Sequence, residues 1–156
     1  MQDAGQDLAP DHGEIRAMLD AIIPDGEPFE IRVVKLRKQT PDGLIEDSFN
    51  KAHTGFYMDT GLAASHAARY AGVHCAGVYV TLNQLPSHAG SWGVDRIAKG
   101  RGTTDVDILR YRYLYIDVDP LRPADTNATE SERTAARERA SHVLAYLRDA
   151  GWPDPV

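Results

Sequence analysis

The chain has 156 residues, of which 42% are hydrophobic and 26% charged, and its formal net charge is −6. These values are typical of one globular domain with a sizeable core, and they exclude attraction to nucleic acid over the whole surface. No apolar run approaches the roughly 20 residues of a membrane helix, and the polar, acidic N-terminus is not a signal peptide. The single cysteine, Cys75, excludes an intramolecular disulfide and favours a reducing compartment, so we expect no membrane contact and a cytoplasmic location.

Residues 1–28 predict an N-terminal tail followed by a short helix, ahead of a main domain at 29–156. Apolar residues at helical spacing predict an amphipathic helix over Gly13–Ile23. Asp11 and Glu14 resemble a capping box at its start.

The next stretch predicts a hairpin followed by a helix. Phe29–Leu36 is rich in β-branched residues, and after a turn at Thr40–Gly43 the chain can return as a second strand over Leu44–Phe49. Gly55–Asp59 then predicts a short apolar turn, and apolar spacing predicts a helix that continues to Tyr70.

A strand is predicted over Ala76–Leu82, and Asn83 follows it. A polar residue just past a strand end is where α/β sheets place ligand contacts, although a turn asparagine fits equally well. Leu85–Arg101 reads as a loop with a helical turn at Val94–Lys99. The basic Gly/Thr stretch Gly100–Thr104 can hold phosphates through its backbone N–H groups, but it lacks the sequence of a P-loop.

The chain is organised around the run Tyr113–Val118, which predicts a strand buried on both faces and ended by Pro120. Asp117 and Asp119 would point to the same side of that strand, with Cα atoms about 6–7 Å apart. Two such carboxylates repel each other, and a pair of divalent cations is the usual remedy. Capping of the following turn is the simpler alternative.

The most distinct helix is predicted over residues 129–150, with Thr129 and Glu132 as a capping box. The order of elements predicts an α/β (α+β) fold with a mixed central sheet and flanking helices. A strand is expected after this helix, so we expect the chain to be the first part of a longer, here incomplete, domain.

Basic residues gather in two stretches of the sequence. Either group can contact nucleic acid or form an ordinary solvated surface. The groups are Arg32, Lys35, Arg37 and Lys38, and then Arg96, Lys99, Arg101, Arg110 and Arg112.

Several stretches together resemble the primase–polymerase domains of the archaeo-eukaryotic primase superfamily, in particular the forms carried by plasmids, phages and other mobile elements. They cover most of the chain from about residue 29, in the order and spacing of that family. The stretches are Gly55–Asp59, Gly77–Asn83, Gly102–Ile108, Tyr115–Pro120 with Arg122 and Pro123, and Ala150–Pro153.

The resemblance implies metal-dependent, template-directed nucleotidyl transfer in DNA replication. It implies that Asp117 and Asp119 are catalytic and hold two Mg²⁺ or Mn²⁺ ions, and that Asn83, Arg110 and Arg112 approach nucleotide or template. Implied partners are a DNA template and primer, nucleoside triphosphates and a helicase. The Ser-x-His motif and third carboxylate of the family are not found, which implies that this chain alone is inactive.

Two other functions are compatible with the sequence. A haloacid-dehalogenase-type phosphatase also has a buried strand ending in Asp-x-Asp, but its motif lies near the N-terminus and favours Thr or Val where this chain has Leu121. A catalytically inactive nucleic-acid-binding or assembly module on the primase-like scaffold is the other alternative.

Overall fold

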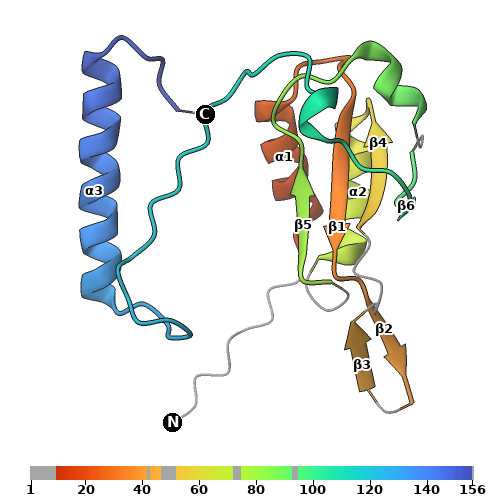
Figure 1. Ribbon diagram of the computed structural model, residues 1–156, viewed down its shortest axis with the longest axis horizontal. Coiled ribbons are helices and arrows are strands. Elements are labelled where there is room, and N and C mark those ends of the chain that lie inside the picture. Colours follow the sequence, from red (N-terminus) through yellow and green to blue (C-terminus); the bar gives the residue numbers. More distant parts are fainter. Residues whose placement is uncertain (1–9, 42, 47–51, 72–74, 93–94, 156) are drawn as a thin grey trace. The chain divides into compact units, whose positions relative to one another are not determined.

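The structure is a computed structural model that describes residues 10–41, 43–46, 52–71, 75–92 and 95–155. The chain forms two compact units, Met1–Tyr113 and Leu114–Val156. The first unit contains a four-stranded sheet and two helices, and the second contains one long helix (Figure 1).

The central sheet of the first unit has the strand order β5-β1-β4-β6. These strands are Gly77–Val80, Phe29–Val34, His53–Tyr57 and Ala98–Lys99. Together with the helices, the sheet confirms a mixed α+β fold. The prediction of a mixed sheet was wrong for the described residues, because every pairing between these four strands is antiparallel.

Strand β1 lies between β5 and β4 in the sheet. Both β4 and β5 pair antiparallel with β1, one on each side, so β4 and β5 run parallel to each other. Helix α2, Thr60–Tyr70, connects them. The unit thus contains a β-α-β crossover whose strands are separated by an inserted strand.

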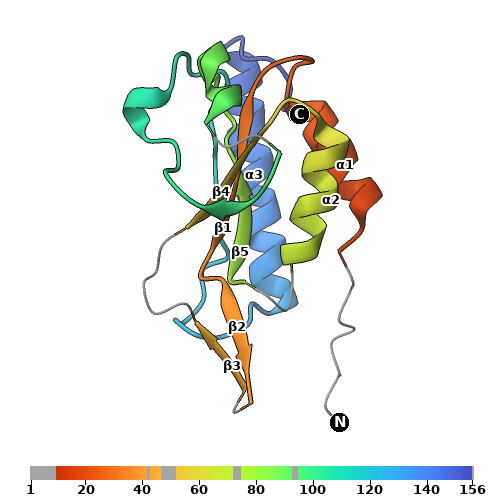
Figure 2. The same cartoon turned by 90° about the vertical axis from the view of Figure 1, so that its right-hand side faces the viewer.

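Helices α1, His12–Ile22, and α2 lie side by side on one face of the sheet (Figure 2). Helix α1 begins at the predicted cap, since Asp11 accepts hydrogen bonds from two of its backbone N–H groups. Helix α2 is capped by Asp59, which accepts a hydrogen bond from the N–H of Leu62. Their apolar sides pack against the sheet. The buried residues of this core are Leu19, Ile23, Phe29, Ile31, Tyr57, Ala63, Ala64 and Ala67.

The predicted hairpin exists, but its strands differ from those expected. Lys35 has a φ of 48°, which interrupts the extended chain after β1. The hairpin is therefore made by β2, Arg37–Thr40, and β3, Gly43–Glu46, in a separate two-stranded sheet. Residues 47–49 of the predicted second strand lie outside the described residues.

The prediction of a turn over Gly55–Asp59 was wrong for Gly55–Tyr57, which belong to strand β4. The structure explains the glycine: a Cβ atom at this position would lie 2.6 Å from the backbone oxygen of Arg96. The backbone of Arg96 passes close to β4, and no side chain fits between them.

The opposite face of the sheet is covered by two short 3-10 helices, η1, Ser87–Ser91, and η2, Asp105–Asp107. A small second core lies beneath η1, where Phe56, Leu85 and Ala89 are buried. The helical turn predicted at Val94–Lys99 was wrong for its described part, because Ala98 and Lys99 form the edge strand β6.

The second unit corrects the central prediction of the sequence. The run Tyr113–Val118 does not form a strand, and the side chains of Leu114 and Tyr115 are exposed. Apolar β-forming residues make a strand only where a neighbouring strand supplies backbone partners, and no strand pairs with this run among the described residues.

Helix α3, Glu130–Asp149, confirms the last predicted helix. Thr129 and Glu132 form the predicted capping box, in which each side chain receives a backbone N–H of the other residue. Gly151, with a φ of 83°, follows the helix end, as a glycine in this position commonly does.

Candidate functional site

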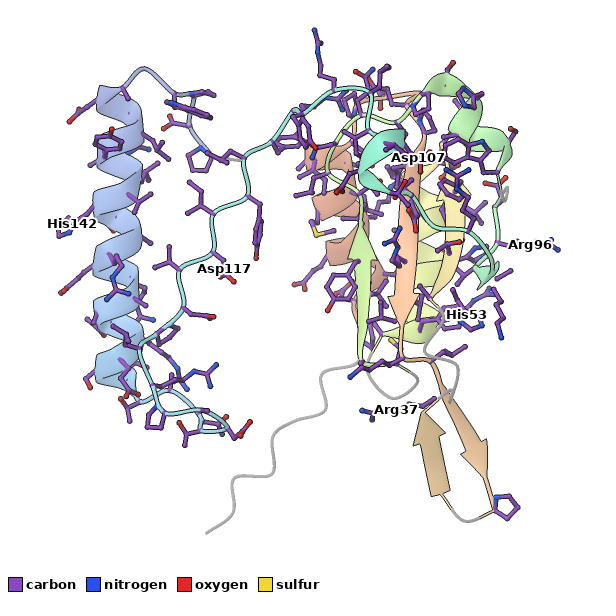
Figure 3. All side chains as sticks on the ribbon, viewed as in Figure 1. Arg37, His53, Arg96, Asp107, Asp117 and His142 are labelled. Atoms are coloured by element: carbon purple, nitrogen blue, oxygen red, sulfur yellow. The ribbon has the colours of Figure 1, made fainter. Side chains whose placement is uncertain are left out.

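Asp117 and Asp119 lie on an extended loop of the second unit. Both are exposed, whereas Val118 and Pro120 are half-buried. Val118 and Pro120 line a shallow hollow together with Arg133, Ala136, Arg137 and Ala140 of α3. This alternation of burial is what an extended backbone produces, so the two carboxylates lie on the opposite side of the segment from Val118 and Pro120. Figure 3 shows Asp117 on this segment.

The donor atoms of this pair suit a hard divalent cation, because carboxylate oxygens are the ligands that Mg²⁺ and Mn²⁺ prefer. Neither side chain has a hydrogen bond or ion pair with another described residue, so both are available as ligands. No group of three or more His, Cys, Asp or Glu side chains that could hold a metal exists among the described residues. In the described part of the chain, the pair therefore offers two carboxylates but no complete set of metal ligands.

Asn83 follows β5, as predicted, and its side-chain oxygen accepts hydrogen bonds from backbone N–H groups. The donors are Arg112, at 2.9 Å, and Tyr113, at 3.3 Å. Asn83 thus fixes the path of the chain where the first unit ends. Its side-chain oxygen is used structurally, which fits the turn asparagine that the sequence left open.

The backbone N–H of Arg112 bonds to Asn83, but the guanidinium of Arg112 is already paired with another residue. Arg112 donates a 2.6 Å hydrogen bond to the carboxylate of Glu27, and both side chains are largely buried. Arg110 is exposed, and its backbone pairs with that of Gln84. Of these two arginines, Arg110 is the one whose side chain is exposed to solvent.

Two of the backbone N–H groups that the sequence offered to a phosphate in the loop Gly100–Thr104 are paired within the protein. The N–H of Thr103 donates to the fully buried carboxylate of Glu30 at 2.8 Å. The N–H of Thr104 donates to Asp107 at 2.9 Å. These two donors therefore hold the loop to the protein itself and are not available to an anion.

A cluster that the sequence analysis missed surrounds Trp92. The guanidinium carbon of Arg101 lies 5.4 Å from the centre of the indole ring, and the rings of Phe56 and His88 approach it edge-on. Arg101 also forms two hydrogen bonds with Asp107, at 2.7 and 3.0 Å. The only sequence signal was an aromatic residue shortly before a basic stretch.

The edge of the sheet next to this cluster carries two more exposed cations, Arg96 and Lys99. Figure 3 shows the side chain of Arg96 extending away from the ribbon. The same stretch contains the acidic residues Asp95, Asp105 and Asp107, so this surface has charges of both signs.

Comparisons with known proteins identify no relative of this chain: no family model, no curated protein and no solved structure matches it significantly. Within the described residues, none of the helices has the length and apolar character that crossing a membrane requires.

Proposed function

We propose that this chain supplies part of the catalytic domain of a metal-dependent, template-directed nucleotidyltransferase that replicates a plasmid, phage or mobile element. The observation that carries the proposal is the pair Asp117 and Asp119, exposed on one side of an extended segment with no partner among the described residues. The resemblance of several stretches to primase–polymerase domains supports the same reading.

In this proposal, Asp117 and Asp119 hold divalent cations, which would neutralise the charge of a nucleoside triphosphate when bound. The described residues provide these two carboxylates, so further ligands must complete the site. Arg110 offers an exposed cation for a phosphate of the nucleotide or template, while Asn83 positions the backbone that leads from Arg112 toward the aspartates.

The first test is calorimetric titration of Mn²⁺ into the chain, with and without a nucleoside triphosphate. We expect binding that tightens with the triphosphate and disappears in the double variant Asp117→Ala and Asp119→Ala. The matched control is Glu138→Ala with Asp149→Ala, which removes two exposed carboxylates from the same unit and should leave binding unchanged.

Equal Mn²⁺ binding by the two double variants would contradict a metal site at Asp117 and Asp119. Incorporation of nucleotides on a primed template tests the reaction separately, and it should also require both aspartates. Metal-dependent hydrolysis of a small phosphoester without any template would instead support the phosphatase alternative.

A further inference from the structure

We propose that Arg101 and Trp92 form a stacking platform for an unpaired base of single-stranded nucleic acid. The inference rests on the proposed function for the class of ligand, but the residues involved belong to the first unit and not to the aspartate pair. Trp92, Asp107 and Arg101 pack together to form the platform.

The guanidinium of Arg101 is held in a fixed orientation by two neighbours. The guanidinium carbon lies over the Trp92 ring, 5.4 Å from its centre, and Asp107 receives two hydrogen bonds from the group. The Arg101 side chain nevertheless remains 68% exposed. Most of the side chain is therefore open to a ligand, while Trp92 and Asp107 restrain the guanidinium.

The indole beneath Arg101 is itself held in place. Phe56, which is buried, packs edge-on against Trp92 at 5.5 Å, and His88 does so at 5.4 Å. Asp107 is in turn fixed by the backbone N–H and hydroxyl of Thr104. A ligand that stacks here meets a platform that needs little ordering, which reduces the cost of binding.

An unpaired nucleic-acid base fits this platform better than a purely anionic ligand does. Bases of single strands stack on aromatic rings and on arginine planes, and every base has such a face. The charge of Arg101 is already balanced by Asp107, and the acidic residues Asp95 and Asp105 occur in the same stretch of sequence as Arg96 and Lys99. Stacking, rather than phosphate attraction, should therefore provide most of the affinity.

The test is the affinity of a short fluorescent oligothymidylate, measured by anisotropy without metal ions, compared with an abasic oligomer of the same length and charge. We expect the protein to bind the oligothymidylate about tenfold more tightly. We also expect a shallow dependence on salt, because few phosphates are neutralised. Equal affinity for the two oligomers, or a steep salt dependence, would overturn the platform.

The variant Arg101→Lys separates stacking from charge, since lysine keeps the charge but lacks the planar group. It should lower affinity for oligothymidylate about tenfold, whereas Arg69→Lys, on the exposed side of α2, should not. Unchanged affinity in a folded Arg101→Lys variant would contradict the proposal. Base-dependent binding without Mn²⁺ binding would leave the platform standing and favour the non-enzymatic module over the proposed transferase.

Discussion

The buried phenol of Tyr57 is the residue whose ionisation the fold changes most clearly. Its hydroxyl lies 2.9 Å from Nδ1 of His66, and its ring is 1% exposed. Burial, and secondarily the negative charge of Asp95, raises the pKa of Tyr57 to about 12. The folded protein therefore keeps the phenolic proton at a pH where the unfolded chain, with a pKa of 10.0, loses it.

This difference predicts a loss of stability in alkali. Below pH 10 the contribution of Tyr57 is fully present, and it is lost as the pH rises toward about 12, by roughly 2–3 kcal/mol for two pKa units. Urea unfolding of the wild type and of Tyr57→Phe across this range measures it. The difference in unfolding free energy between the two proteins should change by that amount, and a constant difference would contradict the prediction.

At the same scale, local sequence could predict some residue roles but not others. Asp11, Asp59 and Thr129 cap helices through backbone groups two or three residues away, so their roles were visible in the sequence. Arg101 and Trp92 meet only because the chain between them turns back along the edge of β4. No short sequence pattern predicts a contact of this kind between two side chains.

At the scale of the elements, α3 depends strongly on its capping box. Its first turn is exposed, and Glu132 donates its backbone N–H to Thr129 while its carboxylate receives the N–H of Thr129 at 2.7 Å. Thr129→Ala should lower the stability of the second unit by about 1 kcal/mol. Circular dichroism during thermal melting measures the loss, and Thr134→Ala, in the exposed helix interior, should cause none.

The pH dependence of the same box gives an independent check. Hydrogen bonds from Thr129 lower the pKa of Glu132 below its usual value of 4.5. The carboxylate therefore stabilises the helix above that value, and this contribution is lost as the pH falls through the lowered pKa. The effect of Thr129→Ala should shrink in acid, and an effect that grows there would contradict the capping role of Glu132.

Helices were predicted better than strands for a physical reason. The apolar spacing and caps of α1, α2 and α3 are properties of each segment alone. A strand also needs a partner, which explains both errors: β4 pairs with β1 despite Gly55, and Tyr113–Val118 pairs with nothing among the described residues. The sequence predicted Asp117 and Asp119 on the same side, because alternation requires only an extended backbone. The burial predicted around them was wrong, since both side chains are exposed.

At the scale of the whole molecule, one buried carboxylate connects distant parts of the first unit. Glu30 on β1 is fully buried, pairs with Arg32 at 2.8 Å and accepts hydrogen bonds from the N–H and hydroxyl of Thr103. Arg32 also donates to the carbonyl of Thr103 at 2.6 Å. The sequence did not indicate these contacts of Glu30, because Thr103 is 73 residues away along the chain.

Glu30→Gln should therefore destabilise the first unit more than an ordinary surface change does. It removes the negative charge that Arg32 and Thr103 surround, at a cost of about 2–3 kcal/mol. Glu14→Gln, an exposed change on α1, should cost less than about 0.5 kcal/mol. Urea unfolding compares the two variants, and equal costs would contradict the role of Glu30.

The position of β1 also determines how the chain can mature during synthesis. At about 5–20 residues per second, a ribosome adds the 73 residues between Glu30 and Thr103 in roughly 4–15 s. Throughout that interval β1 has been translated but lacks part of its final set of neighbours. Glu30 therefore cannot acquire its full set of buried partners until Thr103 has been translated.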